Sequence, residues 1–251
     1  METDWGLLAA PFAAGLLVLA THVPLGIEVL RRGIIFIDLA IAQVAALGVI
    51  AAQLLIHDAA DGGLGVQAAA AAAALAAAML LTWTEKRWPD IQEALIGLLF
   101  VMAASAGILL LANSPHGGEH LKDLLAGQIL WVGWQSLLPA AGLSALLLAL
   151  WFGLRARLGT TGFYLLFALA VTASVQLVGI YLVFASLIAP ALATRACARR
   201  RLAAAYLMGA LGYAAGLLCS AWFDLPAGAA IVCCLGTLAV AALTARPATM
   251  R

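Results

Sequence analysis

The chain has 251 residues, of which 65% are hydrophobic and only 10% are charged. Soluble domains average about 45–50% apolar and roughly 25% charged residues, so this composition cannot cover a water-exposed surface. It excludes an ordinary cytosolic enzyme, a disordered protein and a nucleic-acid-binding protein. A membrane-spanning helix needs about 20 apolar residues, which leaves room for eight or nine spans and for no separate soluble domain.

Nine apolar runs follow one another along the chain, and each predicts helix. They cover residues 5–27, 33–56, 64–83, 91–112, 124–152, 162–180, 181–194, 202–222 and 227–245. The sixth and seventh runs are short and nearly continuous across Gly179, which predicts either two half-crossings or one span followed by a re-entrant piece. The sequence thus predicts an all-α, polytopic membrane helical bundle of about 8–9 transmembrane segments, as one transmembrane domain over residues 1–251.

The basic residues are placed unevenly between these runs. Of the 13 Lys and Arg residues, 12 follow odd-numbered runs, and only Lys122 falls on the other side. The positive-inside rule therefore predicts a multi-pass protein with its N-terminus outside and its C-terminus inside. If the sixth and seventh runs formed one span, the loops after them would lie on the opposite side of the membrane.

Small residues predict close helix packing at two places. The tract from Ala68 to Ala78 is almost entirely alanine, and Gly212 and Gly216 form a GxxxG pair. Both patterns let helix backbones approach closely. A compact bundle accounts for them, and the GxxxG pair alone does not establish a dimer.

Asp38 is an ionisable residue inside an apolar run, about five residues into the second one. A carboxylate within the hydrocarbon is costly unless it faces a cavity, a partner or an ion, so Asp38 is a candidate functional residue. The alternative is that it lies near the inner interface and pairs with Arg31 or Arg32. Gln43 follows on the same predicted helix, five residues away, so the two share a face only loosely.

A second polar cluster lies in the outer loop after the fourth run. It contains His116, Glu119, His120 and Asp123. Imidazole and carboxylate ligands suit zinc, manganese or iron, so the cluster is a candidate metal contact. The spacing matches no established zinc motif, and a solvated polar loop is the alternative. Gln176, Tyr181 and Ser186 surround Gly179, where a broken helix would expose carbonyls to a pore.

No P-loop is present, so the chain is not expected to hydrolyse ATP itself or to be an enzyme. Several segments, in order over most of the chain, resemble the membrane permease subunits of bacterial ABC importers for zinc, manganese and iron. They are Pro24–Gly26 with Val29–Arg32, Glu93–Gly97, Leu124–Leu130 with Ala126 and Gln128 substituted, Val178–Ala193 and Phe223–Gly228.

The chain departs from this family in two places. The family usually carries an acid and a histidine in its second helix, and counting back from Gly48 puts Leu39 and Gln43 at these positions, with Asp38 one step off. The metal path must then differ, or the substrate does. The inner loop 155–161 also lacks about twenty residues of the stretch that docks on the ATPase in the family, so the Arg195–Arg201 loop is the expected substitute.

The resemblance implies a permease in the bacterial inner membrane that imports a divalent metal, zinc first and manganese or iron next. It implies a cytoplasmic ATP-binding subunit, a periplasmic metal-binding protein and a homodimer as partners, no nucleic acid, and no stably bound cofactor. Asp38, Gln43, His116, Glu119, His120 and Asp123 are the expected metal contacts. An ATP-independent secondary transporter or channel, and a non-transporting membrane scaffold, are the alternatives.

Overall fold

The computed structural model describes residues 5–55, 63–111, 125, 127, 129–154, 157–197 and 199–245. These residues form nine α-helices and two short 3-10 helices, with no strand among them. The helices are α1 (Trp5–Arg32), α2 (Ile37–Leu55), α3 (Leu64–Arg87), η1 (Pro89–Ile91), α4 (Gln92–Leu111), η2 (Ile129–Trp131), α6 (Trp134–Leu154), α7 (Gly159–Val178), α8 (Ile180–Ala193), α9 (Arg201–Phe223) and α10 (Ala227–Thr244). The predicted all-α membrane bundle is confirmed.

Seven helices in the described part of the chain are long and apolar enough to cross a membrane, namely α1, α3, α4, α6, α7, α9 and α10. Two further apolar helices are not among these seven, namely α2, which is counted over Ile37–Gln53, and α8. At about 1.5 Å per residue, the 14 residues of α8 reach roughly 21 Å, less than the ~30 Å hydrocarbon core. Since α7 has 20 residues, the break at Gly179 separates one full span from one shorter helix.

The fifth apolar run is not a single helix. Gly127 has a φ of 67°, η2 follows at Ile129–Trp131, and α6 begins only at Trp134. A positive φ is incompatible with a right-handed helix, so the backbone turns at Gly127 although it lies inside an apolar run. The prediction of one continuous helix over 124–152 is therefore wrong for the residues before α6.

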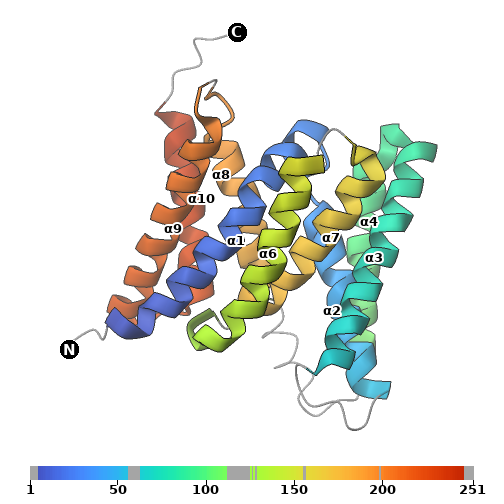
Figure 1. Cartoon of the computed structure of the whole chain (residues 1–251), viewed down its shortest axis with the longest axis horizontal. Coiled ribbons are helices and arrows are strands. Elements are labelled where there is room, and N and C mark those ends of the chain that lie inside the picture. Colours follow the sequence, from blue (N-terminus) through green and yellow to red (C-terminus); the bar gives the residue numbers. More distant parts are fainter. Residues whose placement is uncertain are drawn as a thin grey trace.

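The described basic residues gather at one end of the bundle. The ends of α1, α3, α6 and α8 and the beginnings of α2, α4, α7 and α9 all lie along the upper edge in Figure 1. These ends and their connections carry Arg31, Arg32, Lys86, Arg87, Arg157, Arg195, Arg199, Arg200 and Arg201. The fold thus brings together charges that lie far apart in the chain, as the predicted orientation requires.

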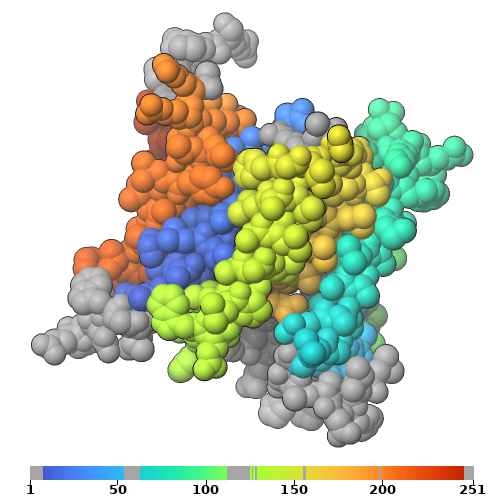
Figure 2. All heavy atoms as spheres, viewed as in Figure 1, coloured from blue at the N-terminus to red at the C-terminus, as the bar shows by residue number. Residues whose placement is uncertain are grey.

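The centre of the bundle is formed by α1, α7 and α8, while α4 and α6 lie outside. In the apolar windows of α1 and α7, 61% of the residues are buried, against 17% in α4 and in α6. Figure 2 shows α6 lying on the outer surface across α1 and α7. Its exposed side carries Leu138, Leu146 and Phe152, each more than half exposed, which suits a helix that faces lipid.

Both small-residue patterns pack within the chain. A Cβ atom on Gly216 would lie 2.3 Å from the Cα of Ile231, and one on Gly212 would lie 2.4 Å from the Leu235 side chain. A Cβ atom on Gly48 of α2 would lie 2.8 Å from the Cβ of Ala73 in the alanine tract of α3. The glycines therefore serve the α9–α10 and α2–α3 contacts inside one subunit.

Replacing Gly216 with alanine is expected to lower the free energy of unfolding by about 1–3 kcal/mol, because the new methyl group meets the α10 backbone. The measurement is the thermal unfolding midpoint in detergent. Gly236→Ala in α10 is the matched control, since its Cβ would meet nothing within 4 Å. The control should be neutral or slightly stabilising, and equal midpoints for the two variants would contradict the α9–α10 contact.

Candidate functional site

A cavity of about 240 Å³ lies between α2, α4, α8 and α10, beside Leu125. Its described lining consists of Leu39, Gln43, Phe100, Leu125, Ile180, Tyr181, Phe184, Ala185 and Val232. Only Gln43 and Tyr181 among these residues carry a polar side-chain atom. We call this space the Gln43 cavity. It joins the second helix to the segment after Gly179, the two regions that the sequence singles out.

The α2 helix presents Leu39 and Gln43 to the cavity, because residues four apart share one helix face. Its beginning is held by α4: the backbone N–H of Phe36 donates to Oε1 of Glu93 at 3.2 Å. A carboxylate is favourable there, since the first N–H groups of a helix have no partner within it. Glu93 thus helps to place the helix that carries Gln43.

Asp38 lies outside the described lining of this cavity. Its side chain is 1% exposed, and its Oδ1 accepts the N–H of Leu39 at 2.8 Å. Its Oδ2 is buried without a hydrogen-bond partner among the described residues. Five helical positions separate Asp38 from Gln43, which turns the two side chains about 140° apart. The structure therefore brings Gln43 to the cavity and turns Asp38 away from it.

The α8 helix begins directly after Gly179 and contributes Tyr181 to the cavity wall. Gly179 has a φ of 83° and a ψ of 163°, a conformation that residues with L side chains avoid. Its N–H donates to the carbonyl of Val175 at 2.9 Å, and its carbonyl accepts the N–H of Val183 at 3.1 Å. One residue therefore both ends α7 and begins α8. Ser186 faces the other way, since its hydroxyl lies 2.8 Å from that of Tyr213, and Gln176 is exposed.

The backbone at Gly127 lies directly against this break. A Cβ atom on Gly127 would be 2.2 Å from the carbonyl oxygen of Val178 and 2.6 Å from the nitrogen of Gly179. Leu125, two residues earlier, lines the cavity, and Ile129, two residues later, is 1% exposed. Gly127 is thus fitted closely against the junction of α7 and α8.

Aromatic rings form much of the cavity wall. Phe100 comes from α4, while Tyr181 and Phe184 come from the first turns of α8. The Phe184 ring is stacked on Phe36, with centroids 6.3 Å apart and an angle of 6° between the planes. Tyr181 and Phe36 are about half exposed, so this wall continues onto the outer surface of the subunit.

Several residues of interest lie elsewhere. The predicted metal contacts His116, Glu119, His120 and Asp123 fall outside the described residues. His22 is fully buried, and its Nδ1 lies 3.0 Å from both the Val18 carbonyl oxygen and the Thr21 hydroxyl oxygen. Among the residues that the structure describes, no three His, Cys, Asp or Glu side chains gather as a metal site would require.

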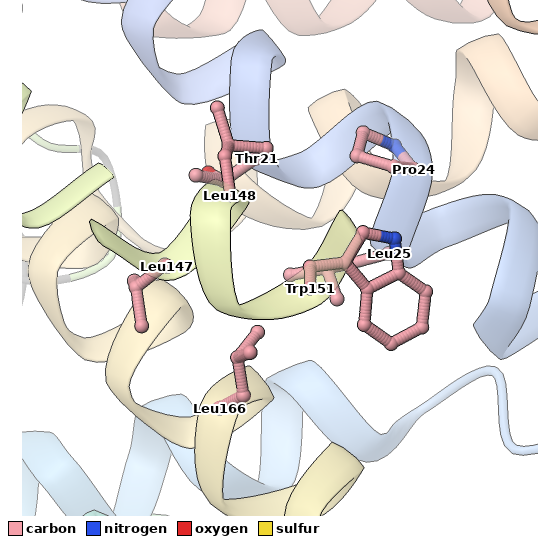
Figure 3. Close-up of a pocket in the computed structure, with 7 residues that line it drawn as sticks. All are labelled: Thr21, Pro24, Leu25, Leu147, Leu148, Trp151 and Leu166. Carbon is pink, nitrogen blue, oxygen red and sulfur yellow. The ribbon is translucent and has the colours of Figure 1, made fainter. Parts of the chain in front are cut away.

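A second space between α1, α6 and α7 is shown in Figure 3. Its wall consists of Thr21, Pro24, Leu25, Leu147, Leu148, Trp151 and Leu166. It has no room for a water molecule, so it is a packing gap rather than a binding site.

The end of the bundle where the basic residues gather also holds a buried ionic group. Glu28 is 2% exposed and forms ion pairs with both Arg31 and Arg32. The Arg32 guanidinium also lies 4.3 Å from the centre of the Phe163 ring. Sequence reasoning missed this group, although the acid and the two bases stand three and four residues apart, the spacing that brings side chains together on a helix.

Beside it, a hydrogen-bonded network joins three helices. The side chain of Gln92 accepts from Thr84 at 2.9 Å and donates to the Leu81 carbonyl at 3.0 Å and to the Tyr164 hydroxyl at 3.3 Å. All four residues are buried, and they link α3, α4 and α7. The network therefore fixes this end of the bundle.

Comparisons with known proteins agree with this architecture. The model of the ABC 3 transport family matches residues 5–163 and 151–246. The solved structure of PsaBC from Streptococcus pneumoniae in complex with Fab contains a chain of similar fold, with a TM-score of 0.78 and 21% sequence identity. The likeness covers 97% of this chain and 93% of that one. A search of curated proteins found no match.

Proposed function

The chain belongs to the ABC 3 transport family, and on this premise we propose that it is the membrane permease of a bacterial importer for a divalent metal ion, zinc first and manganese or iron next. The metal crosses by alternating access through the Gln43 cavity. The observation that carries the proposal is the meeting of α2 and α8 at this cavity, in a chain whose described residues form seven further apolar helices.

The proposed path begins at the outer loop with His116, Glu119, His120 and Asp123 and continues to Gln43. Asp38 belongs to the same path in a different conformation, because its carboxylate is turned away from the cavity in this one. Alternating access requires two conformations, and a buried carboxylate oxygen without a partner is a group that a cation or a rotation of α2 would satisfy.

We propose a homodimer in the inner membrane. The surface around the Gln43 cavity supports it: Phe36 and Tyr181 are about half exposed there, beside the partly exposed Phe184. A second copy laid on this surface would close the cavity on its open side. A large apolar surface with a few polar groups suits a contact between subunits as well as a contact with lipid.

A cytoplasmic ATP-binding subunit would bind the basic end, and a periplasmic metal-binding protein would bind the opposite one. The link between α6 and α7 is short, from Leu154 to Gly159, which leaves no room for a docking helix. The Arg195–Arg201 loop supports coupling in its place. It continues directly from α8, and Arg201 donates to the Ala191 carbonyl of that helix at 3.2 Å.

Uptake of radiolabelled zinc by cells that produce the chain with its ATPase tests the proposal. Asp38→Ala should reduce uptake to background without loss of protein from the membrane, because an intramembrane carboxylate is costly and is retained where the path needs it. Asp90→Ala in the exposed η1 turn is the matched control. Unchanged uptake in the Asp38 variant would remove that residue from the path, and uptake that survives ATP depletion would favour the secondary transporter.

A further inference from the structure

The ligands that the described lining of the Gln43 cavity offers do not suit a bare metal ion. A divalent metal takes four or more nitrogen, oxygen or sulfur ligands in a protein. The described lining supplies the side-chain oxygen of Gln43 and the phenol oxygen of Tyr181, and its other side chains are apolar. Taking an ion out of water with so few ligands is very costly.

The cavity volume does not exclude a hydrated ion, but the chemistry of its wall opposes one. Six water molecules occupy roughly 180 Å³, less than the 240 Å³ of the cavity. Metal-bound water molecules donate hydrogen bonds outward, and most of the described wall cannot accept them. Each polar group that is buried without a partner adds to the cost of entry.

The wall suits an organic surface instead. Phe100, Tyr181 and Phe184 present aromatic rings, and Leu39, Ile180 and Val232 add aliphatic groups. Apolar walls with a few placed polar groups are typical of sites for small organic ligands, and aromatic rings favour stacking with other planar rings. No Asp, Glu, Lys, Arg or His is among the described lining residues. Burying a neutral cargo there therefore costs less free energy than burying a charged one.

We propose that the Gln43 cavity takes its metal as a neutral organic chelate whose planar, unsaturated rings face the protein. The chelator supplies the ligands that Leu39 and Gln43 do not. The inference rests on the proposed function of metal uptake and names the chemical class of its cargo.

A binding experiment tests this on the full chain in lipid nanodiscs. The His116→Ala/His120→Ala background removes the outer-loop imidazoles as zinc ligands. The probes are zinc chloride and the neutral bis-histidine complex of zinc, with both metal and histidine radiolabelled, in equilibrium dialysis. We expect saturable retention of zinc and histidine together, and none of zinc alone. Retention of zinc without histidine, or of neither label from the complex, overturns the proposal.

Variants place the binding in the cavity. Phe100→Ala and Gln43→Leu should each weaken binding of the complex by about tenfold, the loss expected when one good contact is removed. Leu98→Ala is the matched control on α4, since Leu98 is 55% exposed and is absent from the cavity wall. Equal binding by the Phe100 and Leu98 variants overturns the assignment.

A gain-of-function variant tests the missing ligands directly. Leu39→Asp/Gln43→His places an acid and an imidazole four residues apart on the cavity face of α2, and should bind bare zinc at least about tenfold more tightly than the parent chain. Bare zinc bound equally well by the parent overturns the proposal. If cells with the parent chain took up free zinc, the proposed metal import would hold, but the proposal that the metal enters as a chelate would be wrong. If the cells took up neither free zinc nor the zinc–histidine complex, the proposed function itself would be wrong.

Discussion

Replacing Gly127 with alanine is expected to reduce metal uptake to background. The new methyl group would lie 2.2 Å from the carbonyl oxygen and 2.3 Å from the carbonyl carbon of Val178, where backbone atoms cannot yield as a side chain can. Gly127 also has a φ of 67°, which alanine adopts only with strain. The backbone at Gly127 must therefore move off the break at Gly179, and Leu125 is displaced with it from the wall of the Gln43 cavity.

The measurement is the initial rate of zinc uptake, in either free or chelated form, normalised to the amount of protein in the membrane. Gly133→Ala is the matched control, because it lies a few residues further along and its Cβ would meet nothing within 4 Å. The control should transport at the parent rate. A Gly127 variant with the same rate as the control would show that the close contact at Val178 has no part in transport.

Replacing Glu28 with glutamine is expected to lower the free energy of unfolding by about 3 kcal/mol. Glu28 is 2% exposed, and Arg32 beside it has a side chain only 23% exposed. Removing one partner of a buried ion pair leaves the other charge without compensation, which is among the most destabilising single changes. Thermal unfolding in detergent, or loss of folded protein from the membrane, measures the effect.

Two further variants separate charge from packing at this site. Arg31→Gln should change stability little, because the Arg31 side chain is 67% exposed and exposed pairs contribute little. Glu28→Gln combined with Arg32→Met should recover much of the loss, since the charge then left without its partner is that of Arg31, whose side chain is 67% exposed to solvent. Equal destabilisation by the single and the double change would mean that an unpaired Arg32 charge does not account for the loss.

Most of the fold could be predicted from local composition. Eight of the nine apolar runs correspond to single helices within a few residues of the predicted bounds, and the break at Gly179 falls where the two short runs meet. The helix predicted from the fifth run was wrong at its beginning, because apolar character does not distinguish a helix from an irregular segment packed inside the protein. The turn at Gly127 is set by its contact with Val178, 51 positions later in the sequence.

The candidate site was predictable only in part. Gln43 and Tyr181 were singled out by their polarity in apolar runs, and both line the cavity. Asp38 was singled out for the same reason and is turned away from it. Nothing local marks Phe100 or Val232 as wall residues, because they come from α4 and α10 and resemble the lipid-facing residues around them.

The sequence by itself determined that this is a membrane protein, where its helices lie and which loops share a side, because composition and charge act locally along the chain. Only the tertiary structure decided which helix faces meet. In a soluble protein the buried face is apolar and the other polar, but lipid is as apolar as the protein core, so both faces of these helices look alike in sequence. The meeting of α2 and α8, which places Gln43 and Tyr181 in the wall of one cavity, depends on shape rather than on polarity, as the stacking of Phe184 on Phe36 illustrates.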